Sequence, residues 1–163
     1  MTRFLTHRLR HEHGFTLIEL LVVILIIGVL AGVAIPMFLS QTAKAHDSNV
    51  QAAIATAQLA EKTFLTANGH YTPASGTQGN PLLTIEPTLT GAFAATSSSP
   101  SGFGMTVTGA SASGFTVSAT DPVDNISYSL RDTNGVVSRS CSFTGGGSAA
   151  NQGACDAQGS WGG

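Results

Sequence analysis

The feature that most constrains this chain is an apolar stretch close to its N-terminus. From Phe15 to Leu39 the sequence has 25 residues and a single charge, Glu19. About 20 apolar residues are enough for a helix to cross the hydrocarbon core of a bilayer. The stretch therefore predicts a membrane-spanning helix with length to spare.

Basic residues are concentrated ahead of this stretch. Arg3, Arg8 and Arg10 precede it, whereas residues 15–163 carry four Lys/Arg and eight Asp/Glu. By the positive-inside tendency, the N-terminus is expected to stay cytoplasmic and everything after Leu39 to face outward, in a single pass. The remaining Lys and Arg are scattered along the sequence, which argues against a basic patch for nucleic acid.

Two kinds of export signal fit this beginning. Ala43-Lys44-Ala45 offers an Ala-x-Ala pattern, and a cut after Ala45 would release a soluble secreted binding protein that starts at His46. Against this, the apolar run exceeds the roughly 7 to 15 residues of an ordinary signal core. A carboxylate such as Glu19 inside a membrane segment also costs on the order of 2.5 to 3.5 kcal/mol, so it needs a partner or a purpose.

The residues Gly14-Phe15-Thr16-Leu17-Ile18-Glu19, followed by LLVVILIIGVLAGVAIP, resemble the N-terminus of type IV prepilins and the related pseudopilins. The resemblance implies that residues 1–14 are a leader peptide. A prepilin peptidase would cut between Gly14 and Phe15 on the cytoplasmic side and methylate the new Phe15 amine. Because this cut precedes the apolar helix, residues 15–39 would remain in the mature protein.

The resemblance also implies what the mature chain does. It would be a structural subunit of a type IV pilus, a helical homopolymer used for motility, adhesion or DNA uptake, and not an enzyme. Its partners would be copies of itself, the prepilin peptidase, an assembly platform protein and ATPases, and it would move from the cytoplasmic membrane to an extracellular pilus. A pseudopilin of a type II secretion or competence system is the nearest alternative.

Four residues of the apolar helix have expected roles in assembly. As the family implies, Glu19 of one subunit would pair with the Phe15 amine of its neighbour, and the pair would act chiefly as a register device. The alternative is that Glu19 is an acid favoured by the helix dipole. Gly28 and Gly32 have a spacing that lets two helix backbones approach closely, although small residues are also simply common in membrane helices. Pro36 removes a backbone donor and predicts a kink.

The rest of the chain, residues 40–163, predicts one globular domain of the α+β class. Apolar residues at helical spacing, Val50, Ile54, Ala57 and Phe64, extend the helix over 40–67, so that a nearly continuous helix runs from Phe15 to about Thr66. Turn-forming residues predict a loop over 68–102. Period-two alternation over 103–141 predicts a four-stranded antiparallel meander, with Asn134-Gly135 at a hairpin turn. The sheet would pack one face on the helix.

Two cysteines, Cys141 and Cys155, follow the predicted strands. An even count beside an export signal indicates a disulfide in an oxidising compartment, which would close a loop over 141–155. Trp161 is expected to pack on the sheet.

Motifs for catalysis or cofactor binding were not found, including a P-loop, Gly-x-Ser-x-Gly, His-Glu-x-x-His and Cys-x-x-Cys. A metal is therefore not expected, with one alternative. Asp121, Asp124 and Asp132 lie near two turns and could hold calcium, although their spacing does not follow an EF-hand and Asp is an ordinary turn residue.

Overall fold

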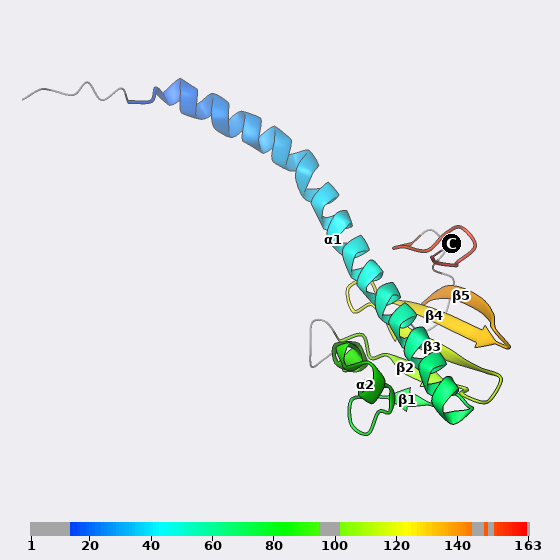
Figure 1. Ribbon diagram of the computed structural model, residues 1–163. Coiled ribbons are helices and arrows are strands. Elements are labelled where there is room, and N and C mark those ends of the chain that lie inside the picture. The colour runs from blue at the N-terminus through cyan, green and yellow to red at the C-terminus, as the bar shows by residue number, and fades with distance from the viewer. Residues whose placement is uncertain (1–13, 95–101, 145–148, 150–151, 163) are drawn as a thin grey trace, which may run out of the picture. The chain divides into compact units, whose positions relative to one another are not determined.

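The computed structural model describes residues 14–94, 102–144, 149 and 152–162 (Figure 1). Most of the predicted leader, residues 1–13, and part of the predicted disulfide loop lie outside the described residues. The chain divides into two compact units, Met1–Leu39 and Ser40–Gly163. The regular elements in chain order are α1 (Leu17–Asn68), β1 (Ala74–Ser75), α2 (Leu82–Ile85), η1 (Pro87–Leu89), α3 (Thr90–Phe93), β2 (Thr106–Thr108), β3 (Gly114–Thr120), β4 (Ile126–Thr133) and β5 (Val136–Phe143).

Helix α1 is 52 residues long and is assigned without a break through Pro36. It ends at Asn68, where Gly69 follows with a positive φ of 76° and donates its N–H to the carbonyl of Leu65. This left-handed glycine is the usual way to satisfy the last carbonyls of a helix. The sequence prediction of a long, nearly continuous N-terminal helix is confirmed.

The second unit is built on an antiparallel sheet with the strand order β1-β2-β3-β4-β5, crossed by the C-terminal half of α1 (Figure 1). The prediction of four strands was wrong, because the sheet formed by the described residues has five. The missing one, β1, has only two residues, which pair with Val107 and Thr106 of β2. A strand this short has no alternation to detect, so only its pairing reveals it.

The segment predicted as a loop over 68–102 contains more regular structure than expected. Besides β1 it forms α2, η1 and α3, each three or four residues long. These single turns bury Leu82, Leu89 and Phe93 in the core. Elements of one turn are too short for a periodic pattern, and the apolar islands that form them are separated by turn-forming residues.

The hairpin between β4 and β5 turns at Asn134-Gly135, as the sequence predicted. Asn134 and Gly135 have φ angles of 53° and 82°, and Thr133 pairs with Val136 across the turn. Two central residues with positive φ are typical of the turn that matches the twist of a hairpin.

The core lies between the sheet and one stripe of α1. Val50, Ile54 and Ala57 are completely buried, as their spacing predicted. Facing them are the inward side chains of β3 and β4, namely Phe115, Val117, Ala119, Ile126, Tyr128 and Leu130. A sheet of this size cannot bury its own face, so the helix supplies the second layer.

The same stripe of α1 also buries an acid that the sequence did not single out. Glu61 is fully buried, and one of its oxygens, Oε2, accepts a hydrogen bond of 3.0 Å from the backbone N–H of Thr72. Its other oxygen, Oε1, has no hydrogen-bond partner in the structure. Because burial penalises the charged form, the pKa of Glu61 is raised to about 7.

We expect this carboxyl to make the protein less stable as the pH rises from about 4.5 to about 7. In that window the folded state keeps a proton that the unfolded state releases, so the free energy of unfolding falls by at most about 1.4 kcal/mol per pH unit. Glu61→Gln should reduce this slope, as measured by chemical denaturation of the full chain in detergent. An unchanged slope in Glu61→Gln would contradict the assignment.

Candidate functional site

The first unit contains a helix suited to an apolar environment. Within the described residues, one segment is long and apolar enough to cross a membrane, the 19 residues Leu17–Ile35. Val22 and Val23 are the least exposed of its large apolar side chains, and each still exposes 47% of its surface. A contiguous apolar surface of this extent marks contact with a membrane or with other proteins.

The start of this helix is capped by its own acid. The Thr16 N–H and hydroxyl donate to Glu19 Oε2 at 2.9 Å and 2.8 Å, and the Glu19 N–H donates to Thr16 Oγ1 at 3.2 Å. This reciprocal pattern is a capping box, in which two otherwise unpaired backbone donors are satisfied. The Thr-x-x-Glu spacing is the sequence signal of this box, whereas the roles predicted for Glu19 were an interaction with the helix dipole and a pairing with a partner subunit.

The other predicted assembly residues lie on the same helix. A Cβ atom built on Gly28 or Gly32 would meet no heavy atom within 4 Å in the described residues. Both glycines therefore face space that another backbone can enter. Pro36 lies within α1, and the predicted kink stays a prediction.

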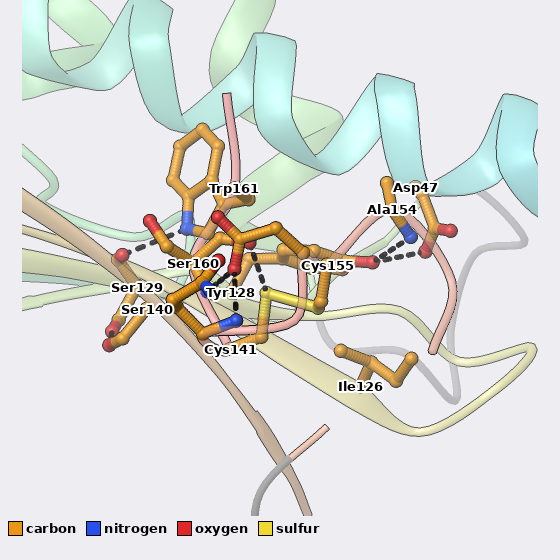
Figure 2. The surroundings of a disulfide bond; sticks show 12 residues. Asp47, Ile126, Tyr128, Ser129, Ser140, Cys141, Ala154, Cys155, Ser160 and Trp161 are labelled. Carbon is orange, nitrogen blue, oxygen red and sulfur yellow. Dashed lines mark hydrogen bonds between the residues drawn. A yellow bond between two sulfur atoms is a disulfide. The ribbon is translucent and has the colours of Figure 1, made fainter. Parts of the chain in front are cut away.

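In the second unit, a disulfide joins Cys141 of β5 to Cys155 of the C-terminal segment, as predicted (Figure 2). The Cys141 N–H donates to the carbonyl of Gly159 at 2.7 Å, so the C-terminal segment also pairs with the outer edge of β5. Covering an edge strand in this way removes a template for unwanted pairing.

Trp161 packs on the sheet, as the sequence predicted. It is 5% exposed, its indole N–H donates to the carbonyl of Ser129 at 3.0 Å, and its ring meets that of Tyr128 edge-on (Figure 2). The Arg139 guanidinium lies 5.4 Å from the centre of the same ring. These contacts hold the C-terminus against β4 and β5.

Tyr128 connects three parts of the second unit. Its hydroxyl donates to Asp47 Oδ1 of α1 at 2.6 Å and accepts the N–H of Ala154, beside the disulfide, at 3.3 Å (Figure 2). Burial and the Asp47 carboxylate raise the pKa of Tyr128, so the phenol stays protonated as the donor. Helix, sheet and C-terminal segment therefore meet at one side chain.

Asp47 also belongs to a group of acids. The structure brings Asp47, Asp121 and Asp124 together, with one carboxylate oxygen from each within 4.8 Å of the others. Of the predicted calcium ligands, Asp121 and Asp124 are in this group, but Asp132 is not. Asp132 Oδ2 lies 3.8 Å from Lys62 Nζ instead.

Burial dominates the electrostatics of this group. Asp47 and Asp121 are both 0% exposed. Desolvation raises the pKa of Asp47 to about 6 and also raises the pKa of Asp121. Asp47 was not among the predicted site residues, although its position three residues before Val50 continues the buried stripe of α1 and is a detectable signal.

Comparisons with known proteins find a methylation motif at the N-terminus and similarity to pilus proteins. Residues 9–35 match the family model described as the prokaryotic N-terminal methylation motif. The type IV major pilin protein PilA of Myxococcus xanthus is 39% identical over 60 residues, which are 37% of this chain and 27% of that protein. Two pilus components of Thermus thermophilus are also similar. The narrow pilus major component PilA5 is 49% identical over 47 residues, 29% of this chain and 40% of that protein. The wide pilus major component PilA4 is 42% identical over 64 residues, 39% of this chain and 49% of that protein.

The chain thus spans less than half the length of the curated relatives it matches. No solved structure matches it. The motif and the relatives support a type IV pilin, and the apolar helix, the antiparallel sheet and the C-terminal disulfide fit the α+β pilin fold.

Removing the disulfide should destabilise the second unit. The bond closes a separation of 14 residues, for which the chain-entropy model gives about 3 kcal/mol. We expect the double variant Cys141→Ala, Cys155→Ala to lower the melting temperature of the full chain in detergent by about 6 to 12 °C. Reduction of the wild type should give the same loss and should leave the double variant unaffected. Equal melting temperatures of wild type and variant would contradict this expectation.

Proposed function

We propose that this chain is the precursor of a structural subunit of a type IV pilus, which is processed by a prepilin peptidase and polymerises through its N-terminal helix. The observation that carries the proposal is the exposed apolar segment Leu17–Ile35 with Glu19 near its start, inside a methylation motif. Nineteen helical residues extend about 28 Å, close to the ~30 Å hydrocarbon core of a bilayer. A bundle of identical helices also provides an apolar environment. The segment is therefore suited both to a membrane before assembly and to helix packing in a fibre.

The proposed cleavage site is accessible to a peptidase. Gly14 and Phe15 precede the first residue of α1, and the Phe15 side chain is 86% exposed. A peptidase must bind the scissile bond as extended backbone, and Gly14 brings no side chain to obstruct that approach. Cleavage there frees the Phe15 amine for methylation and leaves Thr16 and Glu19 in the product, so the capping box survives processing.

Cleavage also creates a positive charge with which a Glu19 carboxylate can pair. A new amine at Phe15 is positive, and the Glu19 carboxylate of a neighbouring subunit can neutralise it in an apolar fibre. Leaving either charge unpaired in such surroundings is costly, so the pair favours one register between subunits over others. Gly28 and Gly32, whose surroundings are open in the single chain, allow helices to approach during the same assembly.

Partners and location follow from this proposal. Arg3, Arg8 and Arg10 favour a cytoplasmic N-terminus and a single pass, with the second unit outside. A membrane platform protein and ATPases would extract the subunit into the extracellular filament, because this chain carries no nucleotide-binding motif of its own.

The mature N-terminus tests the proposal directly. We expect mass spectrometry of the native protein to find a chain that begins at a methylated Phe15, because the cut precedes the retained helix. A chain that begins at His46 would instead establish cleavage after Ala45 and a soluble secreted protein, and it would refute the pilus subunit.

Variants at Glu19 separate its two roles. Glu19→Gln retains a side chain that can cap the helix but removes the charge, so we expect normal processing together with lost or deranged filaments in electron micrographs. Glu19→Ala should show the same defect. The matched control Thr16→Ala weakens the capping box and keeps the carboxylate, so it should still form filaments. Normal filaments from Glu19→Gln would refute the charge pairing.

A further inference from the structure

We propose that Asp47, Asp121 and Asp124 form a calcium site that fastens α1 to the turn between β3 and β4. The three residues come from two places in the sequence, the core stripe of α1 and the Asp121-Pro122-Val123-Asp124 turn. All of them lie in the second unit, Ser40–Gly163. The proposal does not rest on the pilus role proposed above, because it concerns a site remote in sequence from the apolar segment.

Two carboxylate oxygens of this group are buried without a partner. Asp47 Oδ2 and Asp121 Oδ2 are buried and have no hydrogen-bond partner in the structure. In the described part of the chain, no lysine or arginine forms an ion pair with any of the three carboxylates. Two buried oxygens without partners are expensive, and a cation would satisfy both.

The three carboxylates are also close enough together to bind one ion. Oxygens that bind one calcium ion at 2.3 to 2.6 Å lie at most about 5 Å apart. The three acids each offer an oxygen within 4.8 Å of the others, which meets this limit. One oxygen of each acid is held by the protein itself, because Asp47 Oδ1 accepts from the Tyr128 hydroxyl, Asp121 Oδ1 from the Val123 N–H, and Asp124 Oδ1 from the Ile126 N–H.

The group is covered by the C-terminal segment on one side and is accessible to solvent at Asp124. Gly153, with a φ of 54°, passes so close that a Cβ atom on it would lie 2.7 Å from Asp47 Oδ2 and 2.9 Å from the Tyr128 hydroxyl. The C-terminal segment thus covers Asp47. Asp124 is only partly buried, so an ion and its remaining water ligands can enter there.

The donor set indicates which ion fits. Hard carboxylate oxygens without histidine or cysteine favour calcium or magnesium over zinc. Magnesium requires a near-ideal octahedron at about 2.0 to 2.1 Å and retains several waters, whereas calcium accepts irregular sets of carboxylates. Two fully buried acids leave little room for a shell of water, so calcium is the better match.

Terbium luminescence and thermal unfolding of the full chain in detergent test the site. Terbium replaces calcium and is excited by a nearby aromatic ring, and the Tyr128 hydroxyl touches Asp47. We expect terbium luminescence that calcium competes away. After removal of bound metal with a chelator, calcium at ~100 times its dissociation constant should raise the melting temperature by about 5 to 10 °C.

Variants locate the effect. Asp121→Asn and Asp124→Asn should lose the luminescence and the calcium-dependent shift, and Asp124 is exposed enough for its variant to fold if Asp121→Asn does not. Asp132→Asn is the matched control, since Asp132 is a buried aspartate of the same sheet outside the group, and it should keep both signals. No calcium shift, an equal shift with magnesium, or a full shift in Asp124→Asn would overturn the proposal.

Discussion

The structure depends on one constraint, which is that the apolar surface of Leu17–Ile35 has no cover within the described chain. Water is an unfavourable solvent for such a surface, and the segment is long and apolar enough to cross a membrane. Glu19 lies near the N-terminal end of this segment. Its carboxylate accepts hydrogen bonds from Thr16 in a capping box, which satisfies backbone donors at the start of the helix.

In the second unit, the same helix covers the apolar face of the sheet. There its stripe of Val50, Ile54 and Ala57 is completely covered by the sheet, and the sheet in turn gains the second layer that it needs. Two acids, Asp47 and Glu61, interrupt this apolar stripe and are buried with it. Their raised pKa values show that the fold keeps carboxyl groups where burial opposes their charge.

These polar positions and the C-terminal segment form one structure. Tyr128 binds Asp47 on one side and the backbone of Ala154 on the other, while the disulfide and Trp161 fasten the same segment to β5 and β4 (Figure 2). The chain end is therefore held by a covalent bond, an aromatic contact and hydrogen bonds together. A calcium ion at Asp47, Asp121 and Asp124 would add the turn after β3 to this junction.

Local patterns in the sequence determined the long helix, the face that Val50 and Ile54 bury, the strands β2 to β5 with their Asn134-Gly135 turn, and the cysteine pair. Each of these features repeats along the chain or has strong local chemistry, so neighbouring residues suffice to specify it. Only the tertiary structure decided that Ala74–Ser75 forms a fifth strand, that single helical turns fill residues 82–93, and that Asp47 rather than Asp132 joins Asp121 and Asp124. These features depend on contacts between residues far apart in the sequence, where burial and pairing act without a local pattern.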